Sequence, residues 1–282
     1  MPDMDFKALL PLRRKEPRVA LIRLQGAIGI SRPGSAGLSD AALGPLIERA
    51  FRKAKPTAVA LVINSPGGSP VQSALIAARI RRLADETGTP VHAFVEDVAA
   101  SGGYWLACAA DDIWTDPTSV VGSIGVISSG FGFDQFIHKH GVERRVHTAG
   151  GSKSFMDPFR AEKPEDIARL KRLLDDMHDS FKDYVRHRRG TRLTTTRDLF
   201  TGDIWTGRQA LSEETGLIDG IAHVVPKLKE LYGEKVRLMP FAQKKPLFRR
   251  FGAAFGGEIA QEAMQVALAE AEERSLRARY GL

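Results

Sequence analysis

The sequence predicts an α/β fold in which a largely parallel sheet is covered by helices on both faces. Short runs rich in valine and isoleucine alternate with helical stretches from residue 18 onward. Strands that are buried on both faces of a parallel sheet have this near-continuous apolar character. The chain has 282 residues, 43% of them hydrophobic and 27% charged. It is therefore long enough for one large domain with appendages and a sizeable core.

The first half of the chain contains most of the predicted strands. Five runs are predicted to be strands, at residues 19–24, 58–63, 91–95, 113–115 and 124–127. A loop rich in glycine, serine and proline at 31–37 leads into a helix over 38–53, where apolar side chains recur at helical spacing. A second helix is predicted to begin after Ser69 and to run to about residue 86, because Ser69, Pro70 and Gln72 form a capping pattern.

Residues 101–110 are apolar on all sides, which predicts a short, deeply buried helix whose first residue is Ser101. This stretch contains Cys108, the single cysteine of the chain. One cysteine excludes an intramolecular disulfide and a cysteine-only metal cluster. We therefore interpret Cys108 as a small buried hydrophobic residue.

The second half of the chain is predicted to be mainly helical. After Pro164, apolar side chains recur at steps of three and four residues as far as Tyr184, which predicts a long helix with a stripe that suits another helix or subunit. A smaller helical unit around 206–211 ends at Gly216, and residues 221–225 are predicted to form a last strand.

Composition divides the chain into an N-terminal extension at 1–17, a main domain at 18–239 and a C-terminal tail at 240–282. The tail has a basic and aromatic run at 244–255, followed by a helix predicted over 258–279. One interpretation is a helix that contacts a membrane surface or a partner. The alternative is a solvated helix packed on its own subunit.

No apolar run is long enough for a signal peptide or a membrane span. We therefore expect a soluble, cytoplasmic protein, with peripheral contact at the inner face of the membrane as an open alternative. The net charge is +7, but the basic residues are scattered and no nucleic-acid-binding motif occurs, so no nucleic-acid partner is predicted. No histidine pair has metal-ligand spacing, and neither a metal nor a cofactor is predicted.

Three segments carry the chemistry: residues 64–68 at the end of a strand, the triplet that begins at Ser101, and the glycine loop 150–154 that contains Lys153. A serine needs a partner that takes its proton and donors that stabilise the oxyanion. Lysine can be that partner when its amine is neutral, which burial favours. Glycine lets backbone amides approach a substrate carbonyl closely. Each segment alone is a common turn or loop, so the prediction depends on their joint order.

With these motifs in this order, the chain resembles the signal peptide peptidase A (SppA and SohB) family, which are serine proteases of the S49 type. The similarity runs from about residue 18 to residue 225 and includes 121–126 and 153–160. It implies the ββα superhelix shared with the Clp peptidase and the crotonases, here with a C-terminal helical appendage. It also implies that Ser101 is the nucleophile, Lys153 the general base, and Gly68 with the amide of Gly102 the oxyanion hole.

The residues expected to contact substrate lie beside these segments, and they are Gly67, Gly122, Ser123, Ile124 and Gly125. The last four could also form a tight turn into a strand, but the resemblance places them near the substrate groove. A Clp-type triad would have a histidine about two dozen residues after the nucleophile, where this chain has no histidine. We interpret the histidines as structural or surface residues, which leaves the role of base to Lys153.

The resulting prediction is a Ser/Lys endopeptidase that cleaves hydrophobic peptides, such as signal-peptide remnants or membrane-derived peptides, through an acyl-enzyme. The resemblance implies a homo-oligomeric ring whose dyad is completed between neighbouring subunits. Membrane members of the family carry a transmembrane segment before this domain, which is not found here, so peptides at the cytoplasmic membrane face are the expected substrates. Two alternatives stay open: a crotonase-like acyl-CoA enzyme, which would use acidic residues instead, and a non-catalytic ring scaffold at the membrane.

Overall fold

A mostly parallel sheet lies at the centre of the computed structural model, which describes residues 16–29, 37–242, 274–275, 278 and 280. The main path of the sheet is β6-β5-β3-β2-β1-β8, and β4 pairs with both β3 and β7. All pairings are parallel except that between β5 and β6. The strands are β1 (Arg18–Gln25), β2 (Ala58–Ser65), β3 (Val91–Ala100), β4 (Asp112–Thr115), β5 (Val120–Gly122), β6 (Ile204–Thr206), β7 (Gly220–Ile221) and β8 (Arg237–Phe241).

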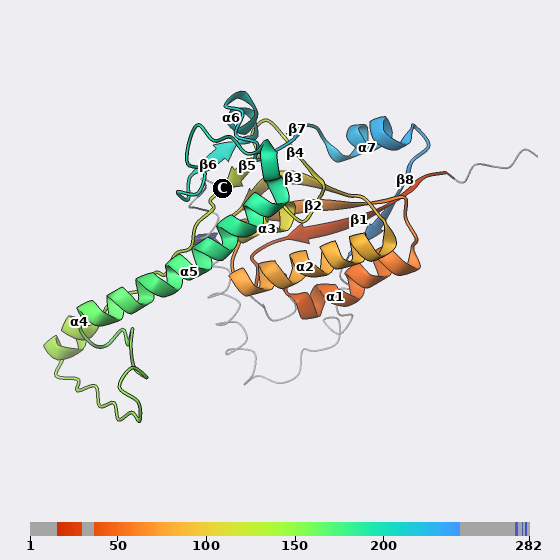
Figure 1. Cartoon of the computed structure of the whole chain (residues 1–282). Coiled ribbons are helices and arrows are strands. Elements are labelled where there is room, and N and C mark those ends of the chain that lie inside the picture. The colour runs from red at the N-terminus through yellow and green to blue at the C-terminus, as the bar shows by residue number, and fades with distance from the viewer. Residues whose placement is uncertain (1–15, 30–36, 243–273, 276–277, 279, 281–282) are drawn as a thin grey trace, which may run out of the picture.

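Helices cover both faces of this sheet, as Figure 1 shows for α1 and α2 on one side and α7 on the other. Every residue of β2 is buried, because alternate side chains face the two layers. Leu61 and Ile63 belong to the main core with α2, whereas Ala58 and Ala60 pack with Leu228 of α7. These helices are α1 (Asp40–Glu48), which continues as the π-turn η2 (Arg49–Lys53), α2 (Pro70–Thr87), α3 (Gly102–Ala107) and α7 (Val224–Tyr232).

A long helix extends from the sheet towards a small separate lobe (Figure 1). This helix is α5 (Pro164–Arg189), and its buried residues all lie near its C-terminal end, at Phe181, Val185 and Arg189. Residues 127–163, which we call the arm, include α4 (Asp134–Lys139) and lie along and beyond the N-terminal part of α5. The remaining elements are η3 (Gly190–Arg192) and α6 (Gly207–Ser212).

The α/β fold and most of the predicted elements are confirmed. β1 to β4 lie at the predicted places, although β3 continues to Ala100, well past the predicted end at 95. Helix α2 begins as the capping pattern predicts, since the Ser69 hydroxyl accepts a hydrogen bond from the Gln72 amide at 3.4 Å. The six residues of α3 are all buried, as predicted for this apolar stretch.

Two predicted strands are wrong. Residues 124–127 are not a strand, because the apolar run there supplies one buried core side chain, Ile124, while Ile127 is exposed. The strand that pairs in this region is β5, just before it. Residues 221–225 form the end of the two-residue strand β7 and the start of α7. Pro226 explains the helix, since proline is accepted in a first helical turn but not inside a paired strand.

The predicted domain boundaries fall near the edges of the described region. The boundary after 239 lies inside β8, whose Pro240 and Phe241 pair with Leu21 and Ile22 of β1. Nearly all of the predicted tail, including the run 244–255, lies outside the described residues, so its proposed membrane contact stays a prediction. Among the helices in the described ranges, none has both the length and the apolar character needed to cross a bilayer.

A buried ion pair fixes the C-terminal end of α5 to the body of the protein. The Arg189 side chain is 1% exposed, and its Nη1 lies 2.7 Å from Oδ2 of Asp219. Arg189 Nε donates to the Gly216 carbonyl at 2.8 Å, and Asp219 accepts from the Ile113 amide at 2.7 Å. Burial alone would raise the pKa of Asp219, but the hydrogen bond and charge of Arg189 outweigh it and lower this pKa.

Replacing Arg189 with alanine should lower the free energy of unfolding by about 3 kcal/mol, because it leaves the Asp219 carboxylate without its main partner. Urea denaturation measures this change. The matched control is Arg186→Ala, which removes an exposed ion pair with Asp183 and should cost no more than about 0.5 kcal/mol. Equal losses of unfolding free energy in the two variants would contradict the role of Arg189 and Asp219 as a stabilising buried ion pair.

The same pair makes stability depend on pH in a defined direction. The pKa of Asp219 is lower in the folded state than in the unfolded chain, so the folded state holds its carboxylate ionised more readily. The contribution of this ion pair to the free energy of unfolding is therefore complete above about pH 4. It is lost as the pH falls through the lower pKa that Asp219 has in the folded state.

Candidate active site

Ser101 lies at a sharp turn between β3 and α3. Its backbone has φ 53° and ψ −122°, a conformation that residues other than glycine rarely adopt. Two hydrogen bonds hold the turn, from the Ser101 amide to the Gly122 carbonyl at 2.8 Å and from the Trp105 amide to the Ser101 carbonyl at 3.0 Å. A strained strand-to-helix turn of this kind exposes a serine hydroxyl at the edge of a sheet in other hydrolases. The predicted nucleophile thus occupies a conformation that presents its side chain.

A cavity of about 900 Å³ lies over this turn. Five of the residues predicted for the site line it, namely Gly68, Ser101, Gly102, Ser123 and Gly125. Its other walls come from residues 201–203 before β6 and Ile204 at its start, from Met177 and Phe181 of α5, and from residues of the C-terminal tail. The cavity therefore collects segments from both ends of the chain around the serine.

The glycine loop after β2 is bound to the segment that follows β1. The Ile28 amide donates to the Gly67 carbonyl at 2.8 Å, and the Ser69 amide donates to the Ile28 carbonyl at 2.9 Å. Gly68 lies between these bonds with φ +139°, where a Cβ atom would collide with the Ile28 backbone. Only glycine fits here, and the loop is held so that Gly68 faces the cavity.

The backbone amides of Gly68 and Gly102, on either side of Ser101, have no acceptor within the described part of the chain. Both residues line the cavity. The two segments are in close contact, since a Cβ atom on Gly67 would lie 2.8 Å from the Ser101 Cβ and 2.9 Å from the Gly102 nitrogen. Free amides on either side of a serine could donate to a developing oxyanion.

Three of the other residues predicted to contact substrate lie outside the lining of the cavity. Gly67, Gly122 and Ile124 are not among the residues that line the cavity. Gly122 packs against the Trp205 ring and accepts the Ser101 amide, while the Ile124 side chain is fully buried in the core. Ser123, by contrast, lines the cavity with φ +52°.

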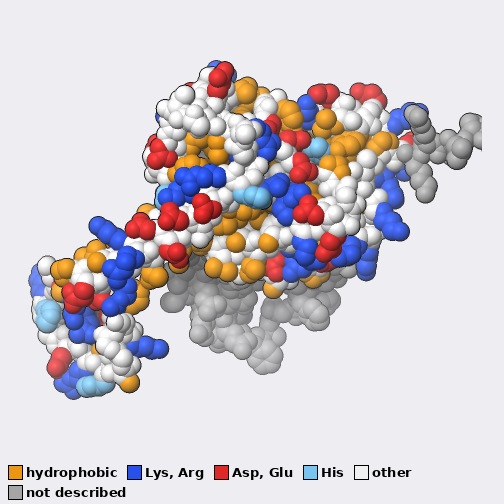
Figure 2. All heavy atoms as spheres, viewed as in Figure 1, with side chains coloured by type: hydrophobic (Ala, Val, Ile, Leu, Met, Phe, Trp, Pro, Cys, Tyr) orange, Lys and Arg blue, Asp and Glu red, His pale blue; other side chains and the backbone are white. Residues whose placement is uncertain are grey.

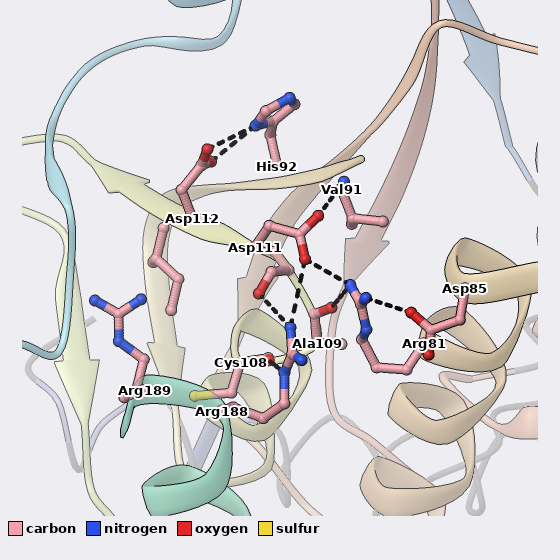
Figure 3. A network of polar contacts seen from close by, with 12 residues as sticks. Arg81, Asp85, Val91, His92, Cys108, Ala109, Asp111, Asp112, Arg188 and Arg189 are labelled. Carbon is pink, nitrogen blue, oxygen red and sulfur yellow. Dashed lines mark hydrogen bonds and ion pairs between the residues drawn. The ribbon is translucent and has the colours of Figure 1, made fainter. Parts of the chain in front are cut away.

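Helix α5 anchors the C-terminal end of α3, the helix that follows Ser101. The Trp105 ring stacks against Phe181 at 4.7 Å and against Tyr184 at 5.0 Å between ring centroids. Arg188 donates from Nε to the Cys108 carbonyl at 2.8 Å (Figure 3). Its Nη2 donates to the Ala110 carbonyl at 2.9 Å. Side-chain donors thus satisfy carbonyls that a helix C-terminus leaves free.

Cys108 itself lies inside this support. Burial raises the pKa of its thiol to about 12, so it is an unreactive core residue, as the sequence predicts. Arg81 of α2 adds a further hydrogen bond, from Nη1 to the Ala109 carbonyl at 3.1 Å (Figure 3). The turn that carries Ser101 is therefore fixed from two helices.

Lys153 does not lie with Ser101 in the single chain. It is exposed in a turn of the arm, where its amide donates to the Gly150 carbonyl at 3.2 Å. The loop between α4 and α5 lies at the far end of α5 in Figure 1. From Pro164 to Phe181, α5 covers about 25 Å at 1.5 Å per residue. The burial that would favour a neutral Lys153 amine is not provided within one chain.

The Ser101 hydroxyl has no hydrogen-bond partner among the described residues. None of the seven histidines lines the cavity. His92 is buried between Asp112 and Tyr232, and His178 donates from Nε2 to the Ile124 carbonyl at 3.0 Å. The described part of one chain thus presents a serine and two free amides without a base.

Some residues of the cavity were not predicted. Ser275 and Tyr280 of the C-terminal tail line it, and the Tyr280 hydroxyl lies 3.2 Å from Oγ of Ser123. No local pattern indicates this contact, because it joins residues 157 positions apart. The segment 201–204, which leads into β6, likewise carries no motif. Its glycine, Gly202, lies beside Gly125 only through the tertiary fold.

Comparison with known proteins shows the family of the chain. The model of Peptidase family S49 matches residues 84–235. A putative protease of Synechocystis is 30% identical, over 83% of this chain and 82% of the relative. A putative signal peptide peptidase SppA of Enterococcus faecium is 31% identical, over 63% of this chain and 51% of the relative.

A longer relative matches more of the chain. A Brucella melitensis protein named Na⁺/H⁺ antiporter NhaA is 46% identical over 98% of this chain. The chain spans 39% of the length of that relative. The similarity therefore covers one part of a longer protein.

Proposed function

We propose that this chain, which belongs to peptidase family S49, is a serine endopeptidase that acts through Ser101 and a lysine base, Lys153. The observation that carries the proposal is the strained turn at Ser101 beside two unpaired amides in one cavity. Relatives at about 30% identity are named as proteases. A nucleophile and preorganised donors are two of the three parts that acyl transfer needs.

In the proposed acylation step, the Ser101 oxygen forms a bond to the carbonyl carbon of the scissile peptide, and its proton passes to the neutral amine of Lys153. The Gly68 and Gly102 amides donate to the oxyanion. The carbon–nitrogen bond then breaks, and the lysine ammonium returns its proton to the leaving amine. Water then attacks the ester carbonyl while the same lysine takes its proton. As the ester bond to Ser101 breaks, the lysine ammonium gives this proton to the Ser101 oxygen, and the acid is released.

Lys153 is proposed to come from a neighbouring copy of the chain. Its position on the arm, away from the cavity of its own chain, is consistent with this arrangement. Within the described ranges, seven of the fifteen exposed large hydrophobic side chains lie between Ile127 and Phe159. Phe131 is 81% exposed and Phe136 is 61% exposed. An apolar surface of this kind favours burial against another protein surface.

The partner proposed for the arm is a second copy of this chain, in a homo-oligomeric ring. Figure 2 shows hydrophobic and basic side chains next to one another on the arm, which projects from the body at the lower left. Helix α5 connects the arm to Trp105, which follows the nucleophile by about one helical turn. If the arm binds a neighbouring copy, α5 therefore connects that contact to the Ser101 site of the arm's own chain.

The proposed substrates are hydrophobic peptides. Apolar side chains dominate several walls of the cavity, and they include Ile28, Trp105, Val126, Met177 and Ile204. A cleft with apolar walls and a few convergent polar groups suits a peptide whose side chains are apolar and whose backbone is polar.

Gly68→Ala tests the oxyanion assignment. The added Cβ atom collides with the Ile28 backbone and displaces the amide that faces the cavity. Hydrolysis of a hydrophobic peptide should fall by about 10²- to 10³-fold in kcat, the loss typical of one oxyanion donor.

The control for this variant is Gly88→Ala at the end of α2. Gly88 also has a positive φ, of +61°, but no atom lies within 4 Å of an added Cβ. It should lose about 1 kcal/mol of stability through backbone strain, less than Gly68→Ala, which also has the collision, and it should keep its kcat. Equal kcat in wild type and Gly68→Ala would refute a role for the Gly68 amide.

A further inference from the structure

The carboxylate of Asp157 is buried in the arm, four positions after Lys153. Its side chain is 8% exposed, whereas that of Glu143, another acidic residue of the arm, is 70% exposed. Removing a carboxylate from water is costly unless hydrogen bonds and an opposite charge compensate for it. The contacts of Asp157 therefore bear on how the segment that carries Lys153 is folded.

Two donors hold the Asp157 carboxylate. The Phe159 amide donates to Oδ1 at 3.1 Å, and Nε of Arg144 donates to Oδ2 at 3.3 Å. The backbone of Asp157 takes part as well, because its carbonyl accepts from the Arg160 amide at 3.1 Å. An aspartate that accepts from the amide two residues on fixes a tight turn. Asp157 therefore closes the turn 157–160 and ties it to Arg144, 13 positions earlier in the chain.

Aromatic contacts extend this tie to the segment before α4. The Phe159 ring stacks on the Phe133 ring with 5.6 Å between centroids, and the Arg144 guanidinium lies 5.7 Å from the centre of the Phe159 ring. The Phe133 amide also donates to the Pro158 carbonyl at 2.6 Å. We call this group, which consists of Phe133, Arg144, Asp157, Pro158 and Phe159, the arm clasp. It joins three separate segments of the arm around one buried carboxylate.

The turn that carries Lys153 is fixed from the side of the arm clasp. On its other side, no described atom beyond the chain neighbours lies within 4 Å of a Cβ atom added at Gly150 or Gly151. After Lys153, by contrast, Nη1 of Arg160 donates to Oγ of Ser154 at 3.2 Å. The side chain next to Lys153 is therefore bonded to the turn that the arm clasp closes.

We propose that Asp157 is a positioning residue for Lys153: by closing the arm clasp, it holds the turn 150–154 so that the lysine amine reaches Ser101 of a neighbouring copy. This inference rests on the proposed function, since it concerns the base of that reaction. A lysine amine extends on a flexible four-carbon stem, so its place depends on the backbone that carries it. Proton transfer needs the amine within hydrogen-bond reach of the serine oxygen. A misplacement of about 1 Å can lower the rate by about 100-fold.

Asp157→Asn tests this role with little change in side-chain volume. The amide keeps an oxygen for the Phe159 amide but lacks the negative charge that holds Arg144. We expect kcat for peptide hydrolysis to fall by about tenfold or more while KM stays within about threefold, because no residue of the arm clasp lines the Ser101 cavity. A raised KM with an unchanged kcat would contradict the inference, since it would place the effect on peptide binding.

Arg144→Ala and Arg145→Ala are a matched pair of variants. Each removes one positive charge from the arm, but only Arg144 belongs to the arm clasp, whereas Arg145 pairs with the exposed Glu143. Arg144→Ala should lower kcat about as much as Asp157→Asn, and Arg145→Ala should stay within about twofold of wild type. Analytical ultracentrifugation shows whether each variant assembles as the wild type does. Equal kcat in the two variants would refute the role of the pair that Asp157 forms with Arg144.

Mixed assemblies show which copy needs Asp157. Ser101→Ala subunits supply the lysine, and Lys153→Ala subunits supply the serine. Asp157→Asn should lower the recovered hydrolysis by about tenfold or more in the lysine-supplying subunit, but by less than about twofold in the serine-supplying subunit. A general effect on folding or assembly would not depend on which subunit carries the substitution. Equal effects in the two placements would therefore overturn the positioning role.

A cross-linking rate tests the same geometry without peptide hydrolysis. Ser101→Cys subunits are mixed with Lys153→Cys subunits and treated with dibromobimane, a short reagent that bridges two thiols. The native Cys108 does not compete, because it is buried and the pKa of its thiol is raised to about 12. Asp157→Asn in the Lys153→Cys subunit should slow the bridging of the two subunits by about tenfold, and in the Ser101→Cys subunit it should leave the rate unchanged.

The outcomes of cross-linking separate this inference from the proposed function. Equal bridging rates in the two placements overturn the positioning role even if the wild type hydrolyses peptides. If the rates differ as expected but the wild type cleaves no peptide, the positioning role stands and the peptidase function fails. Absence of bridging without Asp157→Asn, in assemblies that contain both subunits, means that Lys153 does not reach a neighbouring Ser101 and refutes the inference.

Discussion

Ser101→Ala is expected to lower peptide hydrolysis by about 10⁴-fold or more, because it removes the atom that forms the acyl-enzyme. The substitution deletes one half-buried hydroxyl that has no hydrogen-bond partner within the described residues. The free energy of unfolding should therefore change by less than about 1 kcal/mol. The loss of activity would then be chemical and not a consequence of misfolding.

A serine-directed fluorophosphonate probe gives an independent readout of the same variant. It should label the wild type but not Ser101→Ala. The control variant is Ser212→Ala, which removes an exposed serine of α6 and should still be labelled. Turnover of an acyl-CoA that survives Ser101→Ala would instead favour a crotonase-like enzyme. Absence of labelling in a folded, assembled wild type would favour a non-catalytic scaffold.

Lys153→Ala should lower hydrolysis by a comparable factor, because no histidine lines the cavity and no other base is assigned to Ser101. Lys153 is exposed in the single chain, so the stability of the monomer should not change. Lys153→Arg should be equally inactive, since a guanidinium keeps its proton in proteins and cannot act as a base. Peptide hydrolysis and analytical ultracentrifugation measure activity and assembly separately.

The matched control for Lys153 is Lys139→Ala, another exposed lysine of the arm, in α4. It removes the same charge from the same surface and should leave hydrolysis within about twofold of wild type. Equal losses in Lys139→Ala and Lys153→Ala would mean that the arm needs its overall charge and not one amine. Full activity in Lys153→Ala would exclude this lysine as the base.

Local sequence patterns predicted the parts of the site that depend on neighbouring residues. The glycines after β2, the apolar stretch after Ser101 and the capping pattern at Ser69 each reflect a local backbone requirement, and each is found where predicted. The interpretation of Cys108 was correct for the same reason, since a lone cysteine among apolar residues is buried by its surroundings.

The parts that the sequence did not predict depend on contacts between distant segments. The apolar run 124–127 resembles a strand, but β5 before it supplies the pairing with β3 and Ile124 packs into the core. The positive φ of Ser101 is imposed by the turn from β3 into α3 and by the bond to Gly122, neither of which has a local signature. The contact of Tyr280 with Ser123 joins residues that are 157 positions apart in the sequence.

Mixing two inactive variants tests most directly whether Lys153 acts on Ser101 of a neighbouring copy. Ser101→Ala subunits keep Lys153, and Lys153→Ala subunits keep Ser101, so a mixed ring with a shared dyad contains some complete sites. Co-assembled subunits, with mixing verified by two affinity tags, should regain a measurable fraction of wild-type peptide hydrolysis. No recovery in rings proven to contain both variants would contradict a dyad formed between copies of this chain.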